Sequence, residues 1–167
     1  MTPKPTDEQI KAVHEVLYDP KRLQAQSDLI RNIAVLMNLN PSAELSVNDV
    51  RNPAGSGPNW FETATGAIDS SVIEAAGDCR QLAATLTHTR AEISKLSIPD
   101  EDRKHLMAAL AAEAESWTVR ARIWTDPNPP KNPYTSAIAI TQPLSAAANE
   151  AAQVTPYLKS YKEAKFL

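Results

Sequence analysis

The stretch WFETATGAIDSSVIEAAGDCRQLAATLTHTRAEISKL, residues 60–96, decides the fold of this 167-residue chain. Its apolar positions recur in alternating steps of four and three residues, which places them on one side of an α-helix. Helices packed at a shallow angle carry this spacing. The stretch therefore predicts one long helix with a buried seam formed by Ile68, Val72, Ala75, Cys79, Leu82, Leu86, Thr89, Ile93 and Leu96.

Helix boundaries on both sides of this stretch are marked by capping residues and prolines. Thr6-Asp7-Glu8-Gln9 is a capping box, and Asp19-Pro20 ends one helix and restarts the next. These signals predict a helix over residues 6–38 that is broken at Asp19-Pro20. Pro99 follows the long helix directly, so a second helix over 98–124 should run antiparallel to it.

Prolines also divide the rest of the chain. Residues 39–58 contain three prolines and two glycines and predict a long loop, and TDPNPPKNP at 125–133 predicts a Pro-rich linker. Beyond it the composition is helical. Pro143 and Pro156 suit the first position of successive helices. The predicted helical segment at 143–164 is therefore either two short helices or one kinked helix.

Together these elements predict an all-α fold. We expect a single domain over residues 1–167, an up-and-down bundle of four main helices at 6–38, 60–96, 98–124 and 143–164. The chain is rich in alanine, the best helix former, and 43% of its residues are hydrophobic, which is ordinary for a globular protein.

Composition excludes several classes of function. The net charge is −3 and the basic residues form no block, which argues against nucleic-acid binding. No run of eighteen apolar residues predicts a membrane span. The polar start MTPKPTDEQ contains no signal peptide. It predicts a soluble, cytoplasmic protein, or an exported one if a signal has been removed.

Residues with side chains that could bind a metal or act in catalysis are scattered along the chain. His14, His88 and His105 lack the HExxH and ExxH spacings of metal sites, so we expect them at the surface or at the edge of the core. Cys79 stands alone, which excludes an internal disulfide and a multi-cysteine metal site; on the seam it should be a buried, inert thiol. The sequence predicts no metal and no cofactor.

The segment AESWTVRARIW, residues 114–124, contains two of the three tryptophans. Steps of about 100° per residue place Trp117 and Trp124 on one stripe with neighbouring apolar residues. On this projection Glu113 lies about 40° from Trp117, close to the centre of the stripe, and Arg120 lies at its edge. The stripe is completed by Leu106, Leu110, Ala114 and Ala121.

Two interpretations of this stripe remain open. Glu113 either forms a salt bridge at the rim of the core or faces a partly wet groove with aromatic walls. In the second case the candidate binding residues are Trp60, Glu113, Trp117, Arg120 and Trp124.

Three functions are consistent with the sequence. The first is a non-catalytic helical protein that binds another protein or assembles with itself, favoured by the long seam and the lack of catalytic motifs. The second is a carrier of a hydrophobic small molecule in a pocket between helices, near the tryptophans. The third is a motif-poor helical enzyme that binds an anionic substrate through Arg80, Arg90, Arg103 and Arg120.

Overall fold

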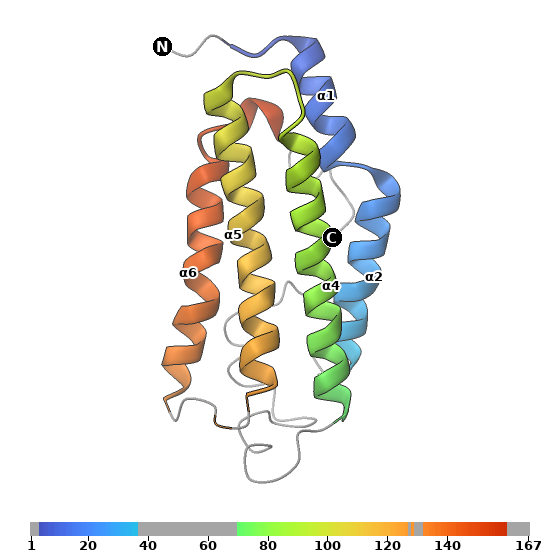
Figure 1. Cartoon of the computed structure of the whole chain (residues 1–167), viewed down its shortest axis with the longest axis vertical. Helices are drawn as coiled ribbons and strands as arrows, with labels where there is room; N and C mark the ends of the chain where they lie inside the picture. The colour runs from blue at the N-terminus through green and yellow to red at the C-terminus, as the bar shows by residue number, and fades with distance from the viewer. Residues whose placement is uncertain (1–3, 37–69, 127, 129–131, 160–167) are drawn as a thin grey trace.

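The computed structural model describes residues 4–36, 70–126, 128 and 132–159. Within these residues the chain is helical and has no strand. α1 and α2 both run down the molecule, and α4, α5 and α6 then run up, down and up, which confirms the predicted all-α bundle (Figure 1). They are α1 (Asp7–Leu17), α2 (Pro20–Leu36), α4 (Ser70–Ile93), α5 (Asp100–Trp124), α6 (Pro133–Ala151) and the short 3-10 helix η2 (Thr155–Tyr157).

The capping box at the start of α1 is confirmed. The Gln9 amide donates to Thr6 Oγ1 at 3.2 Å, and the Thr6 amide donates to Gln9 Oε1 at 2.9 Å. The predicted break also lies where expected, because α1 ends at Leu17 and α2 begins at Pro20. Residues 37–38, which we assigned to this helix, lie outside the described residues.

The long seam is buried along the described length of α4. Seven of its predicted members are buried, and Leu96, beyond the end of the helix, is partly buried. The predicted start at residue 60, the seam residue Ile68 and the loop at 39–58 lie outside the described residues. The seven buried members are Val72, Ala75, Cys79, Leu82, Leu86, Thr89 and Ile93.

A tight turn joins α4 to α5, as the position of Pro99 predicted. The guanidinium of Arg103 donates to the carbonyl oxygens of Leu96 at 2.9 Å and Ile98 at 3.1 Å, which satisfies polar groups within the turn. The first turn of α5 is acidic, where the helix dipole favours negative charge. The turn makes α4 and α5 an antiparallel pair, and this pair forms the centre of the bundle.

The last helix differs from the prediction. It begins at Pro133 rather than Pro143, and the side chain of Asn132 caps it by accepting from the Tyr134 amide at 3.0 Å. Pro143 lies inside α6, so the carbonyl of Ala139 loses its intrahelical donor. Beside this proline, Ser116 Oγ on α5 donates to the Ile140 carbonyl at 3.1 Å, which ties α6 to α5.

The end of this segment is also shorter than predicted. α6 ends at Ala151, and Pro156 belongs to η2 rather than to a second full helix. Residues 160–164 of the predicted helix lie outside the described residues.

The core consists of two clusters stacked along the bundle. The lower cluster lies at the end where α2 finishes and α4 begins, and the upper cluster lies near the α4–α5 turn. Trp117 is partly buried and packs against both. The lower cluster draws buried residues from α2, α4, α5 and α6, and the upper cluster draws them from α1, α4, α5, the α4–α5 turn, η2 and Val154.

Candidate functional site

The structure brings together Trp117, Arg120 and Trp124, three of the five predicted site residues. Arg120 is only 2% exposed, and its guanidinium carbon lies 4.4 Å from the centroid of the Trp117 ring. A cation over the face of an indole is attracted by the electrons of the ring, and the attraction strengthens away from water. Arg120 was expected at the edge of the stripe, but it is part of the core.

Trp124 lies in the lower cluster beside this pair. It is 2% exposed, and its indole Nε1 has no hydrogen-bond partner among the described residues. The buried hydroxyl of Ser136 on α6 likewise has no hydrogen-bond partner among the described residues. Unpaired buried polar atoms are uncommon and cost stability.

The thiol of Cys79 is buried in the same cluster. Burial raises its pKa to about 12, and the positive charge of Arg120 opposes this rise. A thiol with so high a pKa is almost entirely protonated at neutral pH and is a poor nucleophile. The prediction of a buried, inert cysteine is consistent with this environment.

Glu113 does not join these residues. The helical projection placed it near the centre of the buried stripe, but its side chain is exposed. The reason is the arrangement of the neighbours: α4 and α6 pack against the two flanks of α5, whereas α2 packs mainly on α4. Trp60 lies outside the described residues.

The charge of Glu113 instead acts on Arg22, near the junction of α1 and α2. The Arg22 guanidinium donates to the carbonyl of Val16 at 3.1 Å and also to the carbonyl of Leu17, so it caps the end of α1. Burial lowers the pKa of Arg22, and the carboxylates of Asp19, Glu92 and Glu113 counteract this effect.

The four arginines proposed for an anionic substrate do not share one site. Arg103 caps the α4–α5 turn, and Arg120 follows it by seventeen residues on the same helix, roughly 25 Å along the axis. Arg80 donates to Thr125 Oγ1 at 3.4 Å, and Arg90 is exposed on α4.

The histidines occupy three separate environments. His105 Nδ1 lies 2.5 Å from Glu150 Oε2 and joins α5 to α6, while its Nε2 lies 3.6 Å from Glu101 Oε1. His88 is exposed beside Glu92, and the ring of His14 packs edge-on against Tyr18. In the part of the chain that is described, no three His, Cys, Asp or Glu side chains are placed to hold a metal ion.

A buried contact between Asp102 and Tyr157 was missed by the sequence analysis. The Tyr157 hydroxyl donates to Asp102 Oδ2 at 2.6 Å and so fixes η2 onto the start of α5. Burial, together with the hydrogen bond to this carboxylate, raises the pKa of Tyr157 well above its usual range. The two residues are 55 positions apart, and no local pattern links them.

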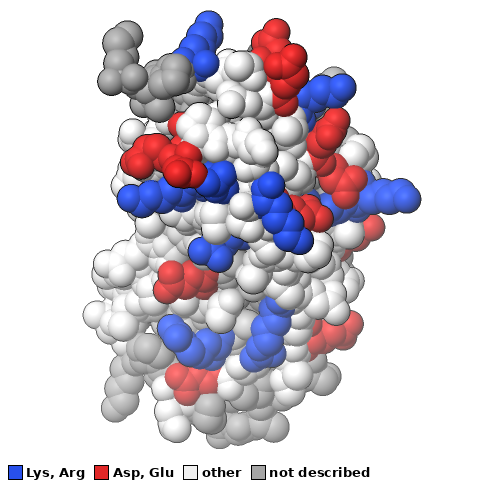
Figure 2. Space-filling view, turned by 45° about the horizontal axis from the view of Figure 1, so that its top comes forward, with Lys and Arg blue, Asp and Glu red and all other residues white. Residues whose placement is uncertain are grey.

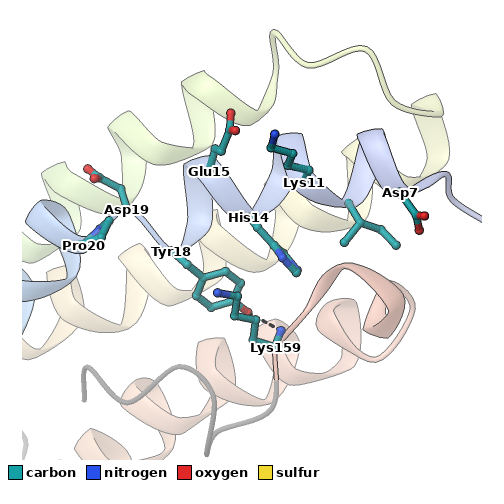
Figure 3. Close-up of a pocket in the computed structure, with 9 residues that line it drawn as sticks. Asp7, Lys11, His14, Glu15, Tyr18, Asp19, Pro20 and Lys159 are labelled. Atoms are coloured by element: carbon teal, nitrogen blue, oxygen red, sulfur yellow. Dashed lines mark hydrogen bonds between the residues drawn. The ribbon is translucent and has the colours of Figure 1, made fainter.

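A shallow groove of about 470 Å³ lies along α1 (Figure 3). On one side the Tyr18 hydroxyl accepts from the Lys159 amide at 2.8 Å, and Lys159 Nζ lies 5.1 Å from the Tyr18 ring centroid. Acidic and basic side chains are mixed, and the groove does not border Trp117 or Trp124. Its walls are Asp7, Ile10, Lys11, His14, Glu15, Tyr18, Asp19, Pro20 and Lys159.

The outward side of α6 is the least charged surface that the described helices present. Tyr134 is 61% exposed and Ile138 is 54% exposed. Glu150 is the only charged residue of α6, and it contacts His105 on α5. We call the following exposed, uncharged side chains the α6 face: Tyr134, Thr135, Ile138, Gln142, Ser145, Ala146 and Asn149.

The other described α-helices carry charged residues on their exposed sides. Examples are Lys11 on α1, Arg31 on α2, Arg80 on α4 and Glu115 on α5. In Figure 2 positive and negative side chains alternate over the visible surface, and white atoms form the left edge at mid-height, on the side where Figure 1 places α6. This contrast could have been read from the sequence, since PYTSAIAITQPLSAAANEA contains a single charge.

Two other large apolar side chains are more than half exposed, Val35 on α2 and Ile73 on α4. They lie away from the α6 face, because α2 packs on α4 whereas α6 packs on α5. Among the described residues there is no helix whose length and apolar character would let it cross a membrane. No protein family, curated protein or solved structure matches the chain.

Proposed function

We propose that the protein is a non-catalytic helical module that binds a protein chain through the α6 face. The observation that carries this proposal is the exposure of Tyr134 and Ile138 on a helix side without charge. Solvent-facing sides of helices are normally rich in charged residues, as on the other described helices here. Exposed apolar side chains grouped with uncharged neighbours are typical of contact surfaces between proteins.

The perturbed ionisable groups support a structural rather than a catalytic role. Strongly shifted pKa values often mark active sites, but each shift here has a packing explanation. Arg22 caps a helix, Cys79 lies in the lower cluster, and Tyr157 fixes η2 onto α5. These three groups belong to different parts of the bundle and do not form a common site.

Site-specific photo-crosslinking tests the proposal. A photo-reactive amino acid at position 138 of the full chain, in the cells that naturally produce it, should form protein crosslinks. The same amino acid at Gln81, an exposed uncharged position on α4, is the matched control. Crosslinks from position 138 but not from position 81 would support binding through the α6 face, whereas their absence from both would reject it.

A further inference from the structure

The second half of α6 is attached to the bundle differently from the first. In the first half Ser136, Ala137 and Ile140 are buried, and Ile140 belongs to the lower cluster. After Pro143 no side chain of residues 144–151 is buried, and none of them belongs to either core cluster. This half, LSAAANEA, consists mostly of small side chains and can bury little apolar surface. Its position on α5 therefore depends on a few specific contacts.

The backbone is also weakened between the two halves. Pro143 has no amide hydrogen, so the Ala139 carbonyl lacks its intrahelical donor, and a helix bends easily at such a point. Beyond the helix the chain is fixed again, because Val154 is buried in the upper cluster and the Tyr157 hydroxyl is bound to α5. Residues 144–151 therefore form a span between two fixed points.

The contact that ties this span to α5 is ionisable on both sides. His105 Nδ1 on α5 lies 2.5 Å from Glu150 Oε2 in the last turn of α6, and His105 Nε2 lies 3.6 Å from Glu101 Oε1. A neutral imidazole has one N–H group, whereas the protonated ring has two. Neutral His105 can donate to only one carboxylate, but protonated His105 donates toward both and carries a positive charge between two negative ones. Hydrogen bonds between charged groups are the stronger kind, so the proton strengthens this bridge.

The other charged residues next to His105 on α5 have different roles. Arg103 donates to carbonyl oxygens of the α4–α5 turn, and Asp102 accepts the hydrogen bond from η2. Lys104 is exposed, and adjacent residues of a helix point apart. On its own helix, the charge that faces the His105 ring is therefore that of Glu101.

The neighbouring elements that are described bring one further charge to the ring, the carboxylate of Glu150. This is the only charged residue of α6. On the antiparallel helix α4, His88 lies at about the same level, but it is exposed and its Nε2 lies 3.3 Å from Glu92 Oε1. On η2 the raised pKa of Tyr157 keeps its hydroxyl protonated and uncharged near neutral pH.

From this arrangement we infer that His105 is a pH-dependent clamp that fastens the second half of α6 to α5. Protonated His105 bridges Glu101 and Glu150, and loss of the proton weakens the bridge and loosens residues 144–151. Because the proton favours the fastened state, attachment is tightest on the acid side of neutrality and weakens as the pH rises, over about pH 5 to 8. The clamp goes beyond the proposed function, since it operates whether or not the α6 face binds a partner.

Hydrogen exchange of the full chain measures the clamp. Protection factors, which are corrected for the intrinsic pH dependence of exchange, are compared for the amides of residues 148–151 in the last turn of α6. They should fall about three- to tenfold from about pH 5.5 to 8, as expected for a charged hydrogen bond that is partly exposed to solvent. Amides at the centre of α4 are the internal reference and should change less.

Three variants assign the effect. His105→Gln retains a side-chain donor for Glu150 but cannot titrate in this range, so its protection factors should no longer depend on pH. Glu150→Gln removes the negative charge of α6 and should give the same flat profile, so the result does not rest on the folding of one variant. His88→Gln is the matched control, because it removes an exposed histidine that is also paired with a glutamate, and it should preserve the wild-type dependence.

Three outcomes would overturn the clamp. These are equal protection of residues 148–151 at both pH values in the wild type, a pH dependence that survives in either His105→Gln or Glu150→Gln, and loss of the dependence in His88→Gln as well. The exchange is measured on the isolated protein, so a failure to crosslink from position 138 would reject the proposed function and leave the clamp intact.

Discussion

At the scale of the residue, the hydrogen bond between Tyr157 and Asp102 should be important for stability. Tyr157→Phe removes the donor and leaves a carboxylate that is 9% exposed without this partner. We expect a loss of about 1–3 kcal/mol in the free energy of unfolding, measured by urea denaturation. Gln81→Ala, at an exposed side chain of α4, is the control and should change stability little; equal effects of the two variants would contradict the prediction.

Cys79 should make stability depend on alkaline pH. Burial raises its pKa in the folded protein from an ordinary value near 9 to about 12. The contribution of the protonated Cys79 thiol to the free energy of unfolding is therefore complete below pH 9 and is lost as the pH rises from 9 through 12. Between about pH 8.5 and 10 the wild type should lose roughly 1 kcal/mol more stability than Cys79→Ala, even though that variant starts lower. Parallel pH profiles for the two proteins would refute this.

At the scale of the element, the sequence predicted structure best where the same packing contact recurs at every helical turn. The seam of α4 was predicted residue by residue over its described length, because every turn meets the same kind of neighbour. The N-terminal helix pair and the turn at Pro99 were predicted from capping chemistry, which is local. These features position the core, and they could be predicted without knowledge of the rest of the fold.

The predictions were wrong or incomplete where residues far apart in the sequence determine the local structure. Pro143 has the chemistry of a helix start, but α6 begins at Pro133 and continues through Pro143 while packed along α5. Glu113 lies at the centre of a one-helix projection, but the buried surface of α5 is defined by two neighbours. The contact between Asp102 and Tyr157 depends on the path of the chain over 55 positions.

The role of Ser116 can be measured directly. Ser116→Ala should lower the free energy of unfolding by about 1 kcal/mol, because the Ile140 carbonyl loses a buried donor beside Pro143. Ser145→Ala changes an exposed serine of α6 and serves as the control. Chemical denaturation of both variants gives the comparison, and a loss no larger for Ser116→Ala than for Ser145→Ala would count against a stabilising role for this hydrogen bond.

At the scale of the whole molecule, the bundle has a central pair and peripheral additions. α4 and α5 contribute to both core clusters, whereas α1, α2, α6 and η2 each pack on one side of this pair. Native-state hydrogen exchange should therefore find the slowest amides in α4 and α5 and the fastest helical amides in α1 and η2. Protection of α1 equal to that of α4 would show that the periphery does not open separately.

The absence of charge from the α6 face has a consequence for the conditions under which the protein works. Contacts between ions weaken as dissolved salt screens them, over a distance of about 10 Å at 0.1 M. A contact made by Tyr134, Ile138 and amide or hydroxyl side chains contains no such term. Association through α6 should consequently stay nearly constant from dilute buffer to about 0.5 M salt, so the protein would hold its partner equally well in compartments of very different ionic strength.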